Sequence, residues 1–545
     1  MNRRILGLVV GTAAFAAIAD NGSSGPSLTN VPSANPKAAG YAPAHQLSRE
    51  LRQIVAAQGS LPLENPDGII GWYGYENDAP SPDNAALPQM VPGTRATLTA
   101  AQKTEPDKNT YLVLKNQKGA DPSYDYGTHF MFQGHELAAR DAQGRHLGYF
   151  TRINLDADTA HRVTLMATHD VNGVPIETID GSTWDPFAQR LLFTTENANA
   201  PTYAATLDFP SQVEDVSGAL GRGGYEGIQN DSDGNLWIVE DIGGGNKPGT
   251  TARIPNSFIY RYLPQRPGDL HNGRLQVLQV LNESGQPVTF ESQTALCAPD
   301  QMALRTYGKS FDTRWVTIHD TAVQGNAPFN ANTAAKAAHG TPFKRPENGV
   351  FRPGSNFREF FFDETGDTNA TSPENGTACA AGGWTSLFKL AQRGPSADQG
   401  ELSLFFQGSM AVAGLDNIQF LSRDLLIAVE DAGDTLHTQR NALDSGYVFD
   451  VTADYLHGLQ PVRWLAEGRD ASAAIDSANG GFGKNDGDNE ITGAHVSDGD
   501  PSVHGILGAK IPNVFRDGWR WFWTGQHGDN ITWEVLPARR HHDDD

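Results

Sequence analysis

The chain has 545 residues, with 64 acidic and 41 basic side chains and a net charge of −23 at pH 7. So acidic a surface repels nucleic acid, and we expect no nucleic-acid partner. Beyond the first residues there is no long uncharged apolar segment, so we expect no insertion into a membrane.

The first 19 residues have the pattern of a signal peptide. Arg3 and Arg4 precede an apolar stretch that runs to Ile18, and Ala19 completes the small-x-small pattern that a signal peptidase accepts. The stretch is shorter than the roughly 20 apolar residues that span a bilayer. We therefore predict an exported protein, periplasmic or extracellular, in which residues 20–45 form a flexible linker.

One short N-terminal helix is predicted in the segment HQLSRELRQIVAAQG. Leu47, Leu51, Ile54 and Val55 recur there at helical spacing, and Gly59 would stop the helix. Beyond it, runs rich in Val, Ile, Leu, Phe, Tyr and Trp alternate with turn clusters such as DSDGN and NESGQP, which is typical of an all-β fold. We expect residues 46–540 to form one domain with inserted loops and residues 541–545 a polar tail.

Three segments repeat one pattern, in which a glycine and a short motif are followed by a polar turn and an apolar strand that closes on acid. They are GSTWDPFAQRLLFTTENAN, GGYEGIQNDSDGNLWIVEDIGG and GLDNIQFLSRDLLIAVEDAGD. Such a repeat predicts a single β-propeller, here of about six blades, because equivalent positions of successive blades converge at a central channel. A β-sandwich would scatter them.

Acids placed directly after apolar strands predict a metal site, because burying an unpaired carboxylate is costly and calcium takes six to eight oxygen ligands. For any single acid, a solvated strand end is the alternative. The candidate ligands in the repeats are Glu196, Asn197, Glu226, Glu240, Asp241, Asp416, Asn417, Glu430 and Asp431.

Outside the repeats, FKRPENGVF offers Arg345 to hold an oxyanion and Glu347 to face a metal, with a loop salt bridge as the alternative. Glu136 in FQGHELAAR is a further candidate acid. Cys297 and Cys379 are compatible with one disulfide or with two free thiols.

Two further groups of residues have plainer interpretations. Asp486, Asp488 and Glu490 in KNDGDNEITG lack the full spacing of an EF-hand, so a general acidic loop or a turn is expected. His504 and His527 could act as acid/base groups or metal ligands, or could cap turns, which we prefer.

These motifs resemble the PhoX-type alkaline phosphatases, which are secreted bacterial β-propellers that use iron and calcium to hydrolyse phosphate esters. RPEN, from Arg345 to Asn348, is similar to the family segment that supplies an arginine and a metal-binding glutamate. The other resembling segments are GYEND (Gly74–Asp78), GHEL (Gly134–Leu137), TTEN (Thr194–Asn197), YEG (Tyr225–Gly227), the acidic pair Glu240-Asp241 and LDNI (Leu415–Ile418).

The sequence departs from the family at two positions. Thr194 stands where the family has an iron-binding cysteine, and Tyr225 stands where it has a histidine. A threonine hydroxyl is a much poorer iron ligand than a thiolate, so the resemblance implies calcium more strongly than iron or another transition metal.

The resemblance implies a metal-dependent hydrolase that acts on small phosphate esters. Separately, we expect the protein to be a monomer. Two alternatives stay open from the sequence. One is a calcium-stabilised propeller that binds a partner without catalysis, and the other is a propeller lactonase or esterase.

Overall fold

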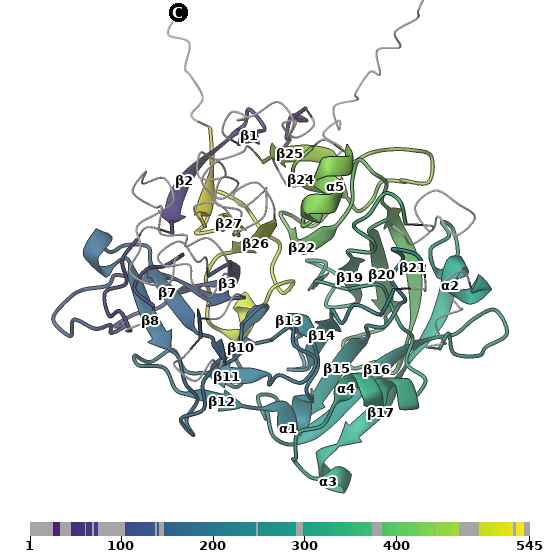
Figure 1. The fold of residues 1–545 in the computed structure, drawn as a ribbon, viewed down its shortest axis with the longest axis horizontal. Helices are drawn as coiled ribbons and strands as arrows, with labels where there is room; N and C mark the ends of the chain where they lie inside the picture. Colours follow the sequence, from purple (N-terminus) through teal and green to yellow (C-terminus); the bar gives the residue numbers. More distant parts are fainter. Residues whose placement is uncertain are drawn as a thin grey trace, which may run out of the picture.

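Six groups of antiparallel strands stand around a central axis, and each is one blade of a β-propeller (Figure 1). This arrangement confirms the predicted all-β fold. The structure is a computed structural model that describes residues 26–32, 45–59, 61–67, 70–74, 104–136, 139–140, 146–246, 249–289, 298–372, 384–440, 442–467, 490–526 and 530–538.

The first three blades follow the chain from the axis outwards. Blade one contains β3 (Pro106–Val113), β4 (His129–His135), β7 (Phe150–Asn154) and β8 (Val163–Ala167). Blade two contains β9 (Ser182–Asp185), β10 (Arg190–Phe193), β11 (Tyr203–Ala205) and β12 (Val213–Asp215). Blade three contains β13 (Tyr225–Asn230), β14 (Leu236–Glu240), β15 (Ile259–Pro264) and β16 (Gly273–Val280).

The other three blades complete the ring. Blade four contains β18 (Gly349–Phe351), β19 (Glu359–Glu364), β20 (Ser386–Gln392) and β21 (Gln399–Gln407). Blade five contains β22 (Leu415–Phe420), β23 (Leu425–Glu430), β24 (Ser445–Asp450) and β25 (Val462–Ala466), with β1 (Gln46–Leu47) at its outer edge. Blade six contains β26 (Ile491–Ser497), β27 (Arg520–Gly525), β28 (Thr532–Pro537) and the N-terminal strand β2 (Leu51–Ala57).

The remaining described elements are short or join blades. Strand β17 (Ser310–Asp320) pairs with β16 and β21, which makes blades three and four one continuous sheet, and β5 (Ala139–Arg140) pairs with β6 (His146–Leu147). The helices are α1 (Ser217–Leu220), α2 (Pro299–Leu304), α3 (Thr321–Gln324), α4 (Ala331–Ala337) and α5 (Gly433–Arg440). None of these helices is long and apolar enough to cross a bilayer.

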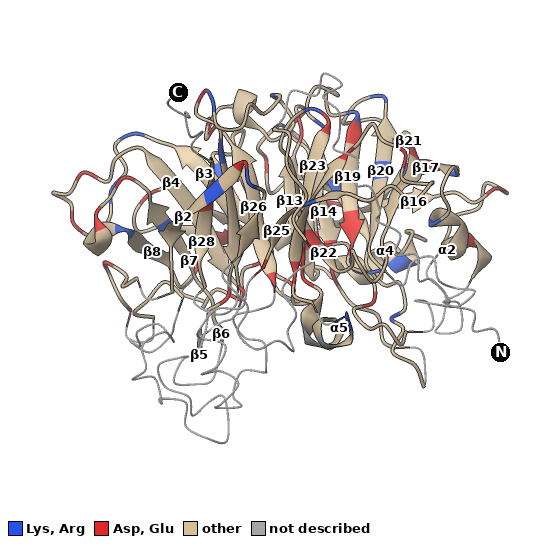
Figure 2. Cartoon of the chain, turned by 90° about the horizontal axis from the view of Figure 1, so that it is seen from above, with Lys and Arg blue, Asp and Glu red and all other residues tan. Residues whose placement is uncertain are grey.

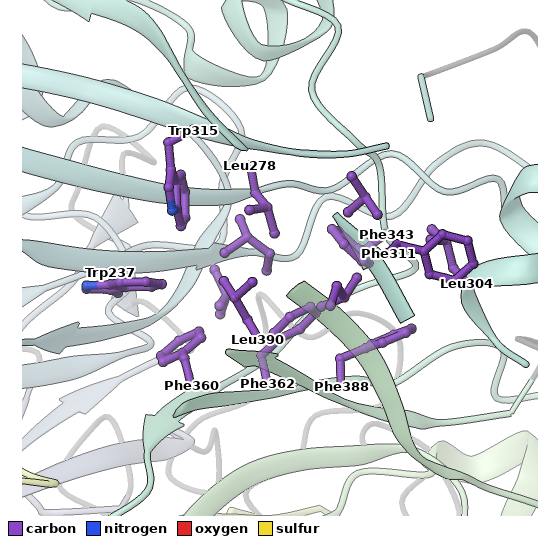
Figure 3. Close-up of a cluster of buried hydrophobic side chains, with 14 of the residues drawn as sticks. Trp237, Leu278, Leu304, Phe311, Trp315, Phe343, Phe360, Phe362, Phe388 and Leu390 are labelled. Atoms are coloured by element: carbon purple, nitrogen blue, oxygen red, sulfur yellow. The ribbon is translucent and has the colours of Figure 1, made fainter. Parts of the chain in front are cut away.

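Each interface between neighbouring blades contains its own buried hydrophobic cluster. Figure 3 shows the one between blades three and four, where Trp237 and Leu278 face Phe360 and Phe388. The innermost strands β3, β9, β13, β18, β22 and β26 also contact one another in that order, and β26 returns to β3. The ring is therefore closed, and equivalent positions of all six inner strands meet at one axis.

The predicted N-terminal helix is wrong, because this segment is strand β2. Its residues pair antiparallel with β28 from Leu51↔Pro537 to Ala57↔Thr532. Without β2, the outer edge of β28 would be unpaired, and closing that edge outweighs a short helical pattern. As a strand, the segment buries Leu51 but leaves Ile54 and Val55 exposed, so these residues do not form the one apolar face that a helix would need.

Part of the expected linker is packed against the propeller. Backbone N–H of Val31 donates to Arg463 O over 2.8 Å, and Val31 lies in a small cluster with Leu443 and Ala466. The signal peptide and the polar tail lie outside the described residues and stay predictions.

Strand β2 allows a matched pair of substitutions. Leu51 is 6% exposed in the core between blades five and six, whereas Ile54 is 42% exposed on the same strand. We expect Leu51→Ala to lower the free energy of unfolding by about 2–5 kcal/mol, because it leaves a cavity. Ile54→Ala should change it by no more than about 0.5 kcal/mol. Urea unfolding of both variants tests this, and similar effects at the two sites would argue against β2 as the closing strand.

Candidate metal centre

One acid from each blade lies at the start of its inner strand. The six residues are Asp107, Asp180, Glu226, Glu347, Asp416 and Glu490. In β3, β13 and β22 the acid falls within a shift of the pairing register, as between Tyr225 and Ile228 in β13. Such β-bulges redirect side chains and are common beside functional sites. Figure 2 shows acidic segments at the lower ends of the central strands, on the side where α5 lies.

Five of these acids, together with Glu136, form two groups of three. Within each group, the possible ligand atoms all lie within 4.8 Å of one another. One group is Asp107, Glu136 and Asp180, and the other is Glu226, Glu347 and Asp416. Asp180 of the first group interacts with Glu226 of the second as well as with Asp107, so the two groups adjoin each other. We call the six residues of these two groups, together with Glu490, the carboxylate ring.

Two glycines allow the inner strands to approach closely at the carboxylate ring. A Cβ atom at Gly181 would lie 1.9 Å from the carbonyl oxygen of Glu226, and one at Gly227 would lie 3.1 Å from Cα of Asn348. Gly227 N–H also donates to Glu347 O over 2.9 Å. These contacts hold the acids of blades two, three and four side by side.

Several buried oxygen atoms at the channel accept no hydrogen bond within the described part of the chain. They are Asp180 Oδ1, Asp241 Oδ1, Asp363 Oδ2, Asn109 Oδ1, Asn417 Oδ1 and Gln526 Oε1. Buried acceptors without donors are rare in native proteins and call for an explanation such as an ion. Oxygen-only donors of this kind suit hard cations such as Ca²⁺, Mg²⁺ or Mn²⁺.

Burial and mutual repulsion raise the pKa values of these acids. Burial raises the pKa of Asp107 to about 6 and that of Glu196 to about 7. The pKa values of Glu226, Glu347 and Asp416 lie well above the usual range, first because of burial and then because of neighbouring carboxylates. An array of carboxyl groups that cannot all ionise together is an environment in which a cation replaces shared protons.

Arg345 lies at this centre beside two acids. Its Nε donates to Asp241 Oδ2 over 2.9 Å, and its Nη2 is 3.3 Å from Glu347 Oε1. Burial opposes its charge, but the surrounding acids, Asp241 and Glu347 foremost, together outweigh burial and raise the pKa of Arg345. Its backbone has φ of 57°, in the left-handed region that non-glycine residues seldom adopt. The loop salt bridge, which was the alternative from the sequence, is therefore present, and it lies beside the candidate metal-binding acids.

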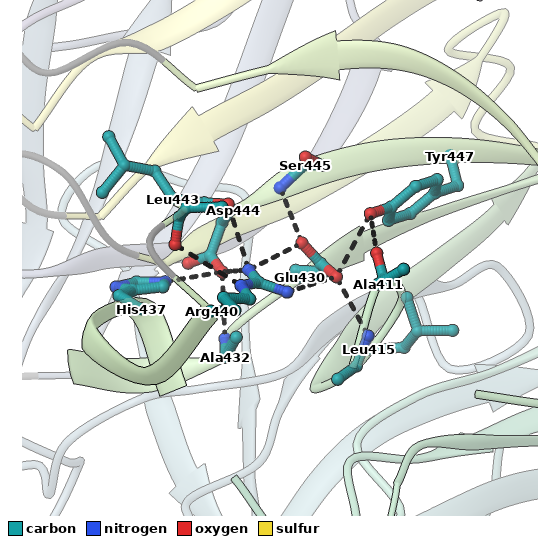
Figure 4. A network of polar contacts seen from close by, with 12 residues as sticks. Ala411, Leu415, Glu430, Ala432, His437, Arg440, Leu443, Asp444, Ser445 and Tyr447 are labelled. Atoms are coloured by element: carbon teal, nitrogen blue, oxygen red, sulfur yellow. Dashed lines mark hydrogen bonds and ion pairs between the residues drawn. The ribbon is translucent and has the colours of Figure 1, made fainter. Parts of the chain in front are cut away.

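Glu430 lies in a different environment from the carboxylate ring. Its two oxygens accept from Arg440 Nη1 and Nη2, both at 3.0 Å, and from the N–H groups of Ala413 and Ser445 (Figure 4). With its acceptor sites occupied by a bidentate guanidinium and backbone donors, Glu430 has no oxygen left for a metal. It is a structural acid that connects β23 to β24 and α5.

Glu240 has the equivalent position in blade three. It accepts from Phe258 N–H at 3.0 Å and Tyr260 hydroxyl at 2.9 Å, as Glu430 does from Ser445 and Tyr447. Asn332 Nδ2 is a third donor. Both glutamates therefore face the third strand of their blade. The acids that follow them, Asp241 and Asp431, lie nearer the carboxylate ring, since Asp241 binds Arg345 and Asp431 acts on Asp416.

Of the other predicted residues, some lie beside the carboxylate ring and others do not. Glu196 is half-buried and interacts with Glu136, Asp241 and Arg345, whereas Asn197 is exposed in a turn. Asn417 is buried and donates to Asp416 Oδ1 over 2.7 Å. His504 lies in an exposed turn whose cap is Ser502. Residues 75–78, Leu137, Cys297, Cys379, Asp486, Asp488 and His527 lie outside the described residues.

Neither residue at the family's iron-binding positions offers a ligand to the carboxylate ring. Thr194 Oγ1 donates a hydrogen bond to the carbonyl oxygen of Glu226. Tyr225 hydroxyl donates to Leu220 O over 2.8 Å, and its ring packs on Tyr260 in the core between blades two and three. The residues present therefore do not fit an iron centre of that kind.

Four residues at the channel were not predicted from the sequence: Asp107, Lys108, Asp180 and Asp363. Asp107 could have been found, because PDKN in β3 has its acid at the same bulge position as YEGI in β13 and LDNI in β22. Asp363 had no such signal, because it lies on the second strand of its blade.

The fold and site define a six-bladed propeller with a carboxylate-lined axis. No model of a known protein family and no curated protein matches the chain. Among solved structures, it is similar to PhoX of Pseudomonas fluorescens in complex with vanadate, a transition-state analogue, with a TM-score of 0.54 and 9% identity over 94% of this chain and 98% of that chain. This similarity shows the fold alone. The periplasmic gluconolactonase PpgL of Pseudomonas aeruginosa gives a TM-score of 0.31 and 12% identity over 90% of this chain and 98% of that one.

The raised pKa values predict how pH affects the metal-free protein. Burial raises the pKa of Glu196 to about 7 and that of Glu240 to about 8, whereas an unfolded glutamate titrates near 4.3. Between pH 6.5 and 8.5 the folded state therefore binds more protons than the unfolded state, and stability falls as pH rises. Below this window, His135 and His495 have the opposite effect, because burial lowers the pKa of each to about 3.

We expect urea unfolding of the metal-free protein to give a smaller free energy at pH 8.5 than at pH 6.5. Saturating calcium should reduce this loss, because a bound cation stabilises the ionised carboxylates. A metal-free protein that gains stability over this range would contradict the assignment.

Proposed function

We propose that this protein is a hydrolase of phosphate esters that uses hard divalent cations, calcium foremost, held by Glu226, Glu347 and Asp416. The observation that carries the proposal is the placement of Arg345 against one of these ligands, at 3.3 Å from Glu347. A guanidinium beside a cation site is suited to an anionic substrate with several oxygens, because it can donate two parallel hydrogen bonds to them.

The residues that would hold cations are the six acids of the two groups. A cation bound there would polarise the phosphoryl group and offset its developing negative charge. Arg345 is oriented by Asp241, which fixes Nε, and Nη1 forms no hydrogen bond within the described residues. We assign Arg345 to bind a phosphoryl oxygen and to orient the ester at the mouth of the channel.

Arg345 is held for this role by rigid neighbours. Thr365 Oγ1 lies 2.5 Å from Glu347 Oε1 and 2.8 Å from Leu415 O, and its single hydroxyl proton is donated to one of these acceptors at a time. Thr365 therefore links blades four and five at the site. Thr365 N–H also donates to Arg345 O over 2.8 Å. A site built on strand ends in this way loses little entropy when substrate binds.

The test is a hydrolysis assay on purified protein with phosphate monoesters, phosphodiesters and lactones in parallel. Calcium, magnesium, manganese and iron are each added to metal-free protein between pH 7 and 10. We expect phosphate-ester turnover with calcium or manganese and its loss in Arg345→Met. Turnover of lactones alone, or of no substrate under any condition, would overturn the proposal.

A cation-stabilised binding protein without catalysis is the second candidate. It is favoured by the positions of Thr194 and Tyr225, which give the carboxylate ring no ligand for a transition metal. Under this candidate, calcium would raise thermal stability and no ester would be hydrolysed. Metal analysis together with the assay above separates the two candidates.

We also propose that the enzyme acts outside the cytoplasm, as the N-terminal pattern indicates. Fractionation of cells that express the full chain should recover the cleaved protein outside the cytoplasm. Uncleaved protein in the cytoplasm would contradict this location.

A further inference from the structure

Lys108 is the basic residue that β3 places beside the carboxylate ring. The bulge in β3 sets Asp107 and Lys108 together opposite Gly134, because Pro106 pairs with His135 and Asn109 with Gln133. In a bulge two adjacent residues face one on the partner strand, so the local side-chain direction changes there. The bulges of β13, β22 and β26 have Gly227, Asn417 and Ala494 at the second position, so blade one alone has a charge there.

The ammonium group of Lys108 is buried and lacks a direct partner. Its side chain is 2% exposed, and Nζ makes no hydrogen bond within the described part of the chain. Buried lysines are normally paired, since an isolated ammonium costs several kcal/mol or more to bury. A satisfied core lysine is therefore not the explanation for this residue.

Four carboxylates from different blades act on Lys108. Burial lowers the pKa of Lys108, and the four carboxylates oppose burial by stabilising the charged form. Asp416 lies on β22, Glu226 on β13, Asp107 on β3 and Asp363 on β19. Because these strands belong to blades five, three, one and four, only a position near the axis brings all of them within reach. Asp363 Oδ2 and Asn417 Oδ1, which are buried without donors, belong to the same channel.

We propose that the Lys108 ammonium is a resident cation of the carboxylate ring, which occupies the axial position among Asp363, Asp416 and Glu226 and excludes one divalent cation from it. This inference rests on the proposed cation binding. The lysine contributes a single positive charge where a metal would contribute two, so the number of bound metals is set partly by this side chain.

The test is the number of calcium ions bound per chain, measured by native mass spectrometry and by equilibrium dialysis with elemental analysis. Lys108→Met keeps the length of the side chain and removes its charge. We expect it to bind one more calcium ion per chain than the unsubstituted protein. Lys115→Met, at an exposed position just beyond β3, is the matched control and should bind the same number as the unsubstituted protein.

A second variant shows whether Lys108→Met creates a new calcium site at this position or only raises calcium affinity elsewhere in the protein. In Lys108→Met/Asp363→Asn the new position has lost a carboxylate, and we expect the additional calcium ion to be lost again. Equal or lower calcium binding by Lys108→Met than by the unsubstituted protein would overturn the inference. So would a gain that persists unchanged in the double variant.

Lys108→Met is expected to depend on calcium for folding, because it leaves the acids without their internal cation. If it does not fold in metal-free buffer, refolding is followed over a calcium series up to the millimolar range. Recovery with calcium supports the inference, and failure at every concentration contradicts it. An unsubstituted protein that binds no calcium would instead refute the proposed cation binding, which keeps the two failures distinct.

Discussion

Replacing Glu226 with glutamine is expected to weaken calcium binding by roughly 100-fold or more and to reduce kcat/KM for phosphate esters by at least the same factor. Loss of residues that only support a metal ligand costs about 10–100-fold, so loss of a ligand should cost more. Glu226 belongs to one acid group and interacts with Asp180 of the other, so its removal affects both groups. Calorimetric titration and steady-state kinetics measure the two effects.

The matched control is Glu401→Gln, which makes the same chemical change at an exposed position on β21. It should leave calcium affinity and kinetics within a factor of about two. If Glu226→Gln retained the calcium affinity of the unsubstituted protein, the carboxylate ring would not be the cation site.

The second large effect is expected from Arg440→Met. Arg440 on α5 is bound by both oxygens of Glu430 and is 3.0 Å from Asp444 Oδ1, and all three side chains are buried. Removing one partner of such a pair leaves uncompensated charge and costs about 3–5 kcal/mol. We expect a loss of this size in the free energy of unfolding, measured in urea with saturating calcium.

The network around Arg440 also connects to the carboxylate ring, so Arg440→Met should weaken calcium binding as well. Asp444 accepts from Ala432 N–H at 3.2 Å and from Glu490 N–H at 2.8 Å. Ala432 is adjacent to Asp431, and Glu490 belongs to the carboxylate ring.

Arg266→Met, at an exposed position, is the control and should change neither the free energy of unfolding nor the calcium affinity. In Glu430→Met/Arg440→Met both charges are gone, and part of the stability should return. A loss below about 1 kcal/mol in Arg440→Met would show that the network does not support the fold.

The propeller could be predicted because its repeat is visible in the sequence. YEGIQN and LDNIQF both begin inner strands, and the strands that follow them both end on Glu-Asp. Glu226 and Asp416 were found at the site for this reason, and Glu347 was found through RPEN. Their approach to within 4.8 Å follows from ring closure, which the repeat implies.

The roles of the strand-end acids could not be predicted in the same way. Consecutive residues of a strand point to opposite sides, so Glu240-Asp241 places one acid towards β15 and the next towards the channel. The sequence shows the two acids but not which one meets Tyr260 and which one meets Arg345. The position of Lys108 among the channel acids was not predicted, because these acids come from blades that are distant in sequence and no local pattern predicts that they meet.

A crystal grown with manganese and measured at the manganese absorption edge would show directly whether cations bind at the carboxylate ring. We expect an anomalous peak at the channel, from an ion bound by carboxylate oxygens of Glu226, Glu347 and Asp416 at about 2.0–2.6 Å, the range that hard cations adopt with oxygen ligands. Clear density for these side chains with no anomalous peak among them, at a manganese concentration that supports turnover, would contradict it.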